Sequence, residues 1–251
     1  MRRVAVWIYP FALLVGAWWV LAEQGVLGNA FVMPPPDRVL ERGRELAADG
    51  SLGRQTLATL REVLVAYALA LVVGVGLGTL IGCVRPVRLA LRPIVSFLFP
   101  APKIALYPAM LIVFGLGTES KVALGFSEAV FPVLVATAAG TSQVDTRLVW
   151  SAAALGTGRR AALAKVVLPA ALPFVLTGAR IGLVGAIIGV FVGEMIAGAE
   201  GLGHMMAVAY RTLDTADMYV AIACVSIIGL LLDRGFLATR ARLLAWSPEE
   251  R

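Results

Sequence analysis

Charged side chains are scarce in this chain: Asp, Glu, Lys and Arg together make up 15% of its 251 residues. A soluble globular domain carries about a quarter. Hydrophobic residues account for 59% of the chain, and the mean hydropathy is +0.86. These values exclude an ordinary soluble domain and predict an integral membrane protein.

Residues with catalytic and metal-binding chemistry are also few. The chain has one histidine, His204, and two cysteines, Cys83 and Cys224, which lack the spacing of a zinc site and are expected to be free packing residues. It contains no H-E-x-x-H, no G-x-S-x-G and no Walker-type G-x-x-x-x-G-K-[ST] motif. The sequence therefore predicts neither an enzyme nor an ATPase, and no cofactor in this chain.

Negative charge is in the minority, because 22 Lys and Arg face 16 Asp and Glu and leave a net charge of +6. A basic chain can bind nucleic acid, but these arginines cluster in short segments between long apolar runs. Basic clusters of that kind orient a protein in the membrane, since they stay on the cytoplasmic side. We therefore expect the lipid bilayer as a partner, and no nucleic acid.

The N-terminal apolar run, residues 1–22, carries tryptophans near its ends and is long enough to span a bilayer. It predicts a retained first transmembrane helix with its N-terminus in the cytoplasm, with a signal peptide cleaved after Ala22 as the alternative. Residues 23–56 form a polar segment expected outside. There Asp37 is expected to cap a short amphipathic helix through Val39, Leu40 and Leu46.

The remaining apolar runs predict five more spans, at about 59–82, 93–116, 121–140, 172–197 and 218–237, followed by a cytoplasmic tail at 241–251. Residues 57–240 thus form one transmembrane domain. Prolines within 93–116 predict that the helix there is broken. Small residues in the first of these spans are expected to pack closely against another helix, namely Gly74, Gly76, Gly78 and Gly82. The basic loop Arg85–Arg92, the segment near Arg159 and the tail then share one side, so six helices with both termini cytoplasmic is the consistent topology.

The polar segment 145–169 interrupts the second half of the chain. Asp145 is placed to cap a helix that Gly156 and Gly158 end, because glycine readily adopts the backbone angles of a helix terminus. A second short helix is expected from about Arg159 to near Leu168, since Pro169 has no N–H to donate. The sequence therefore predicts a basic helix-turn-helix at the membrane surface.

The spacing within this segment carries a family resemblance. Gly156 is followed after nine residues by Val166, and one residue later come Leu168 and Pro169. This resembles the G-x9-I-x-L-P half of the EAA loop of binding-protein-dependent ABC importer permeases. The chain also resembles the branch of this family that imports nitrate, sulfonates and taurine, in the segments LPAALPFVLTGARIGL, GEMI and Gly201-Leu202-Gly203. The resemblance covers roughly residues 30–242.

The first half of the motif differs from the family. The Glu-Ala-Ala positions fall on Trp150, Ser151 and Ala152, so only the second alanine is kept. The resemblance implies that 145–169 is a coupling loop that docks on an ATPase subunit. The residues expected to make this contact are Trp150, Ser151, Ala152, Gly156, Arg159, Arg160, Val166, Leu168 and Pro169.

The resemblance also implies an architecture and partners. The fold is expected to be all-α, with six transmembrane helices around a type I ABC importer permease core in the bacterial inner membrane. Two ATPase subunits that hold ATP and magnesium, an external solute-binding protein and a second permease copy are the implied partners. The cargo implied is a small polar or anionic solute. Permeases of the same family for aromatic acids or vitamin precursors are alternatives, and an ion-gradient-driven secondary transporter is the alternative outside the family.

Charges within apolar runs need partners or an aqueous path, because an unpaired charge in hydrocarbon costs several kcal/mol. Glu128 lies near the middle of its run, and Lys103 in the preceding one is a candidate partner. The two either line the translocation path or form an inter-helix ion pair. Glu194 either lines an external gate or accepts hydrogen bonds from backbone near Gly193. Arg180 and Asp233 are expected to contact headgroups or partner loops.

Overall fold

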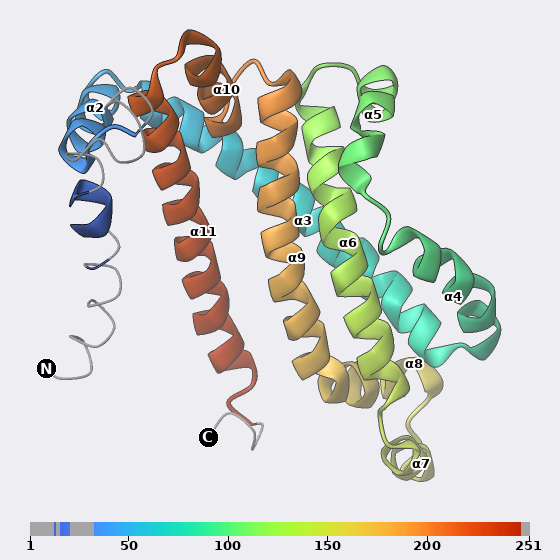
Figure 1. Cartoon of the computed structure of the whole chain (residues 1–251). Helices are drawn as coiled ribbons and strands as arrows, with labels where there is room; N and C mark the ends of the chain where they lie inside the picture. The colour runs from blue at the N-terminus through green and yellow to red at the C-terminus, as the bar shows by residue number, and fades with distance from the viewer. Residues whose placement is uncertain (1–12, 14–15, 21–32, 247–251) are drawn as a thin grey trace, which may run out of the picture. The chain divides into compact units, whose positions relative to one another are not determined.

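The computed structural model describes residue 13, residues 16–20 and residues 33–246, so most of the predicted first span lies outside the described residues. Every regular element in the described part is a helix (Figure 1). In chain order the elements are α2 (Pro36–Ala48), α3 (Ser51–Cys83), α4 (Arg85–Leu98), η1 (Lys103–Leu106), α5 (Tyr107–Phe114), α6 (Thr118–Ser142), α7 (Thr146–Ala154), α8 (Arg159–Ala162), η2 (Leu163–Val167), α9 (Leu168–Ala197), α10 (Leu202–Thr212) and α11 (Thr215–Leu243).

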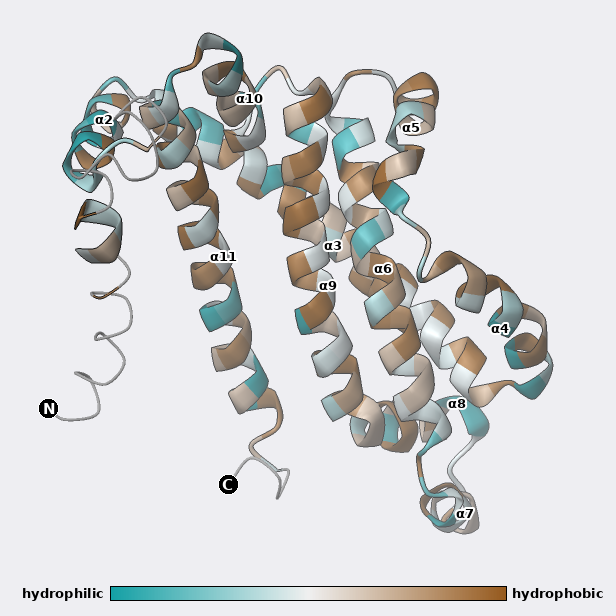
Figure 2. Cartoon of the chain, in the orientation of Figure 1, coloured by the Kyte–Doolittle hydropathy of each residue, from teal (hydrophilic) through white to brown (hydrophobic). Residues whose placement is uncertain are grey.

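Four of these helical stretches are long and apolar enough to cross a membrane: Ser51–Cys83, Thr118–Ser142, Arg159–Ala197 and Thr215–Leu243. A fifth candidate is the pair Arg85–Leu98 and Lys103–Phe114, which is bent by 88°. Hydrophobic residues predominate along α9, whereas α7 and α8 carry hydrophilic ones (Figure 2). The predicted all-α membrane class is confirmed for the described part of the chain.

The bent pair confirms that the proline-containing run is not one helix, and it corrects the placement of the preceding basic segment. Arg85, Arg88 and Arg92 do not lie in a loop, because they occupy the first turns of α4. Pro86 fits there, since a proline at the start of a helix removes an N–H that would have no partner. The chain then leaves α4 at Phe99 and resumes as the 3-10 helix η1 and as α5.

The described chain divides into two compact units. Unit 1 comprises Met1–Thr59 and Glu194–Ile227, and unit 2 comprises Leu60–Gly193 and Ile228–Arg251.

In unit 1, helix α2 packs on α11 through its apolar face. Val39 and Leu46 are buried against Val220, whereas Leu40 is exposed. The predicted cap at Asp37 is wrong: Pro35 is the N-cap residue, without a side-chain cap, and Asp37 lies in the first turn. The proline ring already fixes the backbone angle that starts the helix, and an acid in the first turn still complements the helix dipole.

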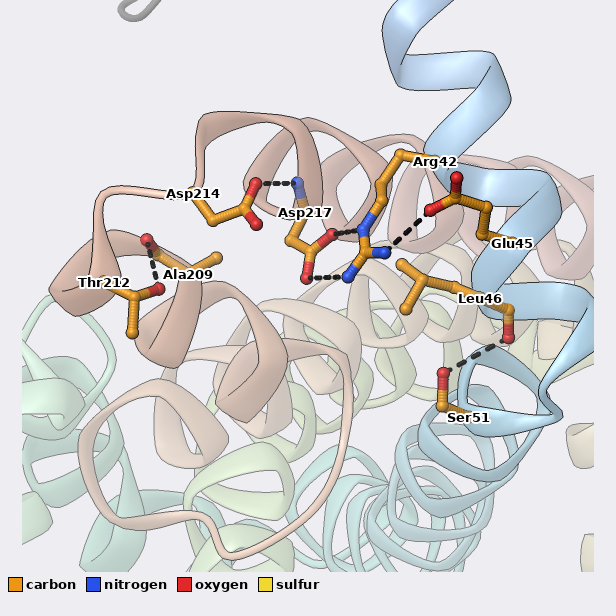
Figure 3. Close-up of polar contacts among 8 residues, drawn as sticks. All are labelled: Arg42, Glu45, Leu46, Ser51, Ala209, Thr212, Asp214 and Asp217. Atoms are coloured by element: carbon orange, nitrogen blue, oxygen red, sulfur yellow. Dashed lines mark hydrogen bonds and ion pairs between the residues drawn. The ribbon is translucent and has the colours of Figure 1, made fainter.

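An ion pair joins α2 to the start of α11 in unit 1 (Figure 3). The Arg42 guanidinium donates to both carboxylate oxygens of Asp217, from Nε at 2.5 Å and from a terminal nitrogen at 3.3 Å. It also donates to Glu45 at 2.8 Å. The hydrogen bond to Asp217 is the largest cause of the raised pKa of Arg42, and Glu45 adds to it. A bidentate contact of this kind fixes the orientation of α2 on the start of α11 as well as the distance between them.

Unit 2 is built around α6, which α3 approaches along a row of glycines. A Cβ atom at Gly74 would lie 2.8 Å from the Val133 Cβ, and one at Gly78 would lie 2.7 Å from the Leu134 carbonyl oxygen. Gly82 meets α6 in the same way. The predicted close packing is therefore confirmed for these three glycines. It is wrong for Gly76, which has no heavy atom within 4 Å of that position.

A second row of glycines brings α9 equally close to α6 within unit 2. Built Cβ atoms would lie 2.7 Å from the Pro132 carbonyl oxygen at Gly178, 2.8 Å from that of Ala129 at Gly182 and 2.9 Å from that of Glu128 at Gly185. The buried core between the three helices is correspondingly made of small side chains: Val63, Ala66, Ala70, Val122, Ala129, Val130, Ala186 and Val190. Close backbone approach of this kind lets dispersion contacts drive association in lipid.

We expect Gly78→Ala to destabilise the protein by about 1–3 kcal/mol, because the added methyl group meets a backbone oxygen that cannot move aside. Gly76→Ala is the matched control in the same helix. It should be neutral or stabilising by about 0.5–1 kcal/mol, since alanine favours helix over glycine. Thermal unfolding in detergent micelles measures both variants, and equal midpoints for the two would contradict the packing role of Gly78.

Candidate functional site

The segment that follows α6 folds as the predicted capped helix and glycine turn. Asp145 is the N-cap of α7, and its carboxylate accepts a hydrogen bond from the Arg147 backbone N–H at 2.9 Å. The helix ends at Ala154, and Gly156 follows with a positive φ of 78°. The Gly156 and Thr157 N–H groups return to carbonyls of the last turn at 2.9 and 3.0 Å. A residue with a side chain would be strained at this angle.

The second helix does not stop at Pro169, contrary to prediction. Helix α8 passes through the π-helical turn η2 directly into α9, so that Arg159–Ala197 is one helical stretch of 39 residues. The Leu168 N–H bonds to the Leu163 carbonyl, five residues back. This widened turn lies just before the proline, where the missing N–H interrupts the normal ladder, and π turns are a common way to absorb such a defect. Val166, Leu168 and Pro169 thus belong to the start of a long helix.

Large apolar side chains of α7 are uncovered. Trp150 is 70% exposed and Leu155 is 86% exposed, and no residue of α7 is buried. Ser151, Gly156 and the side chains of Arg159 and Arg160 are exposed as well, whereas Ala152 is half-buried. Among the described residues, neither of these two arginines forms an ion pair. Figure 1 shows α7 and α8 at the end of unit 2 where α6 ends and α9 begins. The segment is a basic surface with apolar protrusions.

Lys103 and Glu128 approach each other within unit 2, as the sequence suggested. The Lys103 Nζ lies 3.9 Å from a Glu128 carboxylate oxygen, and it donates to the Phe99 carbonyl at 2.8 Å. Its ammonium also lies 5.2 Å from the centre of the Phe131 ring and 5.8 Å from that of Phe99. The Glu128 side chain remains 23% exposed. The pair is therefore loose, and the lysine is held mainly by the backbone and the two aromatic rings.

Glu194 lies in unit 1 and is completely buried. Its Oε2 accepts hydrogen bonds from the Thr59 hydroxyl at 2.9 Å and from the Gly203 N–H at 2.8 Å. The Thr59 hydroxyl oxygen in turn accepts from the Leu202 N–H at 2.8 Å. These contacts support the hydrogen-bonding alternative, although the backbone concerned is that of α10, not that near Gly193.

The same side chains cap α10, because the N–H groups at a helix start have no partner within the helix. The Gln55 side-chain oxygen accepts a further hydrogen bond from the Gly201 N–H at 2.6 Å. Gly201 has a φ of 106°, and a Cβ atom there would collide with the Glu194 carboxylate. The Gly201-Leu202-Gly203 sequence is thus a turn before a helix, as predicted, and the buried carboxylate is the reason for its first glycine.

One buried ion pair in unit 2 escaped the sequence analysis. The Lys121 Nζ lies 2.5 Å from Glu62 Oε1, with both side chains 3% exposed. Beside it the Tyr107 hydroxyl donates to the Gly193 carbonyl at 3.1 Å. Glu62 and Lys121 each lie at the edge of an apolar run, where a charge normally reaches the headgroups. Lys121 begins the 121–140 run and Glu62 lies three residues into the 59–82 run, so their position near run ends was the only available signal.

Arg180 and Asp233, which are expected from the sequence to contact headgroups or partner loops, instead bind each other in unit 2. The guanidinium donates to both carboxylate oxygens, at 2.7 and 2.9 Å, and joins α9 to α11. Neither residue needs a lipid headgroup or a partner loop to satisfy its charge. Among the described residues, no cluster of three or more His, Cys, Asp or Glu side chains is arranged to hold a metal ion.

Comparison with known proteins agrees with this arrangement. The chain is 34% identical over 253 residues to the taurine transport system permease protein TauC of Escherichia coli K12, covering 99% of this chain and 92% of that protein. It is 31% identical to the nitrate import permease protein NrtB of Synechocystis, covering 89% and 83%. It is 29% identical to the putative aliphatic sulfonates transport permease protein SsuC of Bacillus subtilis, covering 94% and 85%.

The fold has a solved counterpart in a chain of the inward-facing MetNI methionine ABC transporter. The TM-score is 0.67 at 20% identity, over 78% of this chain and 98% of that one. Residues 66–242 match the family described as the binding-protein-dependent transport system inner membrane component. This match covers most of the chain, and it includes the capped helix, the glycine turn and the long helix that follows. The chain therefore belongs to the binding-protein-dependent transport system inner membrane component family, whose members are permeases of ABC importers.

Proposed function

We propose that this chain is the permease subunit of an ATP-driven importer that moves a small polar or anionic solute of the taurine, alkanesulfonate or nitrate type by alternating access. The observation that carries the proposal is the uncovered basic helix-turn-helix at 145–169, which has the spacing of an ATPase-coupling loop. The three relatives named for taurine, sulfonates and nitrate support the solute class. A relative named for bicarbonate transport extends the class to another small anion.

The proposed topology has six membrane spans with both termini in the cytoplasm. The described helices supply four spans, or five with the bent pair, and residues 1–22 supply the first. Residues 23–56 then lie outside, 57–240 form the permease domain and 241–251 form a cytoplasmic tail. This arrangement keeps the basic start of α4, the coupling loop and the Arg240–Arg242 region on one side, as the positive-inside rule requires.

The proposed assembly contains two copies of this permease, two ATPase subunits and an external solute-binding protein. ATP and magnesium are held by the ATPase subunits, because this chain lacks a phosphate-binding motif. Coupling residues on α7 and around Gly156 face the ATPase, and the helical stretch from Arg159 transmits its motion. Val166, Leu168 and Pro169 contribute by shaping the entry to that helix.

Trp150 gives this coupling surface an unusual chemistry. The family motif has a glutamate at this position, whereas here an indole ring is 70% exposed. It belongs to the same segment as Arg147, Arg159 and Arg160. Burying a tryptophan on association yields a large apolar contribution, and aromatic residues of this kind are frequent energetic centres of interfaces. The matching ATPase groove is therefore expected to be apolar with an acidic rim.

The permease assignment is tested by crosslinking in a variant whose two native cysteines are replaced by serine. A cysteine at Ser151 or Gly158, both exposed, should crosslink to a co-expressed ATPase subunit. A cysteine at Ala162, which is 6% exposed, is the matched control and should not react. Absence of an ATPase adduct, together with uptake that collapses with the proton or sodium gradient, would indicate a secondary transporter.

Gly156→Val should uncouple ATP hydrolysis from uptake while leaving membrane insertion intact. The φ of 78° is open to glycine and costs a β-branched residue on the order of 1–3 kcal/mol, so the turn must rearrange. Gly158→Val is the control, because Gly158 has an ordinary φ of −67° and open space around it. Uptake per ATP hydrolysed in proteoliposomes measures the effect, and equal ratios for the two variants would refute a role for the turn.

Glu128→Gln should change the relative uptake rates of anionic and zwitterionic solutes by roughly threefold to tenfold, if about 1 kcal/mol of local electrostatic interaction is lost. The loose pair with Lys103 leaves the carboxylate partly exposed and able to act on a solute. Glu119→Gln, in the exposed first turn of the same helix, is the control. A lower unfolding temperature with unchanged solute preference would assign Glu128 a structural role only.

Glu194, buried as the cap of α10, is proposed to act on the path indirectly by fixing that helix.

A further inference from the structure

A pocket with a volume of about 480 Å³ lies between α4 and α6 in unit 2. This is within the range of about 300–1,000 Å³ that small-molecule sites occupy. None of the residues that line it belongs to the coupling loop or to the Lys103–Glu128 pair. The proposed function therefore does not account for it.

The two ends of the pocket differ in chemistry. Arg88 donates hydrogen bonds to the Ile81 and Gly82 carbonyls at the end of α3, and Gly82 packs against Thr141 near the end of α6. The start of α4 thus lies beside the end of α6, and three of the four polar lining residues come from there: Arg88, Arg92 and Ser142. The fourth, Ser96, lies further along α4.

The other end of the pocket is apolar. Phe99, just after α4, lies with Phe131 of α6 around the Lys103 ammonium, so the far end of the pocket faces the middle of α6. The lining residues there are Val95, Phe99, Leu134 and Val135. Leu134 and Ser142 are separated by eight residues of helix, or about 12 Å at 1.5 Å per residue. The pocket therefore has a cationic mouth, the end lined by Arg88, Arg92 and Ser142, and an apolar interior.

The charges at the mouth are available to a ligand. Arg92 is exposed and, within the described residues, makes no ion pair. The pocket has no acidic lining residue. Arg88 already donates to the α3 carbonyls, where its charge complements the negative end of the helix dipole, and the guanidinium keeps its positive charge. An anion at the mouth would be stabilised by both arginines, whereas the Ser142 hydroxyl already donates to the Ala139 carbonyl at 2.9 Å.

The mouth also lies at a defined level of the membrane. Helices α3 and α6 are both long and apolar enough to span, and they end at Cys83 and Ser142 beside it. Residues at the end of a span meet the lipid phosphates, while those two turns earlier meet acyl chains. The pocket is thus cationic where the bilayer is anionic and apolar where the bilayer is hydrocarbon.

We propose that this pocket binds an anionic phospholipid, with the phosphate between Arg88 and Arg92 and an acyl chain along Phe99, Leu134 and Val135. The assignment of the site to the cytoplasmic leaflet rests on the proposed function. The bound lipid bridges α4 to the last turn of α6, three residues before the Asp145 cap of the coupling helix. An anionic leaflet therefore stabilises the base of the coupling loop.

Native mass spectrometry of the purified full chain in micelles, titrated with phosphatidylglycerol or phosphatidylcholine, tests this site. Phosphatidylglycerol should bind more tightly, and Arg92→Gln should weaken its binding about fivefold, the factor that corresponds to about 1 kcal/mol per arginine at a membrane surface. Val135→Trp, which fills the apolar end without changing charge, should weaken it as well. Binding of phosphatidylcholine to the Arg92→Gln variant should be unchanged.

Arg85→Gln is the matched control, since Arg85 is an exposed arginine of the same helix that does not line the pocket. It should change phosphatidylglycerol binding by less than twofold. Equal losses in the Arg85 and Arg92 variants would reduce the effect to diffuse attraction and overturn the site, as would equal affinity for the two lipids or full binding by Val135→Trp.

A solute in place of a lipid is a further outcome that would overturn the proposal. If millimolar taurine or nitrate displaces phosphatidylglycerol and itself requires Arg92, the pocket belongs to the transport path. Because lipid binding is measured without an ATPase, failure here with intact crosslinking at Ser151 would refute the lipid site alone. Failure of crosslinking with intact lipid selectivity would refute the coupling assignment alone.

Discussion

Close contact between the backbone of α6 and those of α3 and α9 is the constraint on which unit 2 depends. Glycines at intervals of three or four residues on both flanking helices remove the side chains that would separate them. In a bilayer the surrounding lipid is as apolar as the helices, so the hydrophobic effect does not bring spans together. Contact area and dispersion must do so, and both fall steeply with a gap of even a fraction of an ångström.

This packing determines where charge is tolerated. The Glu62–Lys121 pair is almost completely buried and short, so two desolvated charges are compensated by strong mutual attraction. The Lys103–Glu128 pair is longer and partly exposed, and its lysine is stabilised by a carbonyl and two aromatic faces. The first arrangement has little capacity for another ligand. The second leaves a carboxylate that a solute can reach, which is why the proposed selectivity role falls on Glu128.

The coupling segment joins the two helices that the glycines hold together. Its first half is a separate capped helix ended by a glycine turn, and its second half is continuous with α9 through a π turn. A displacement of α8 is therefore passed to α9 without a flexible joint. The bidentate Arg180–Asp233 pair then connects α9 to α11 within unit 2. Coupling through such rigid elements needs no large local deformation.

Local features of this chain followed from the sequence, because they depend on residues near one another along it. Apolar length predicted the membrane helices, Asp145 and Gly156 predicted the cap and the turn, and the prolines predicted the broken span. Tertiary structure decided which glycines pack, which charges pair and how a helix passes Pro169. Gly78 shares a helix face with Gly74 and Gly82, and Gly76 lies on another face, but only the position of α6 decides which face packs. Glu62 finds Lys121 only because α3 and α6 lie in contact. The cationic mouth of the pocket between α4 and α6 arises in the same way, since Arg88 binds the end of α3, and only the packing of Gly82 on Thr141 brings that end beside α6.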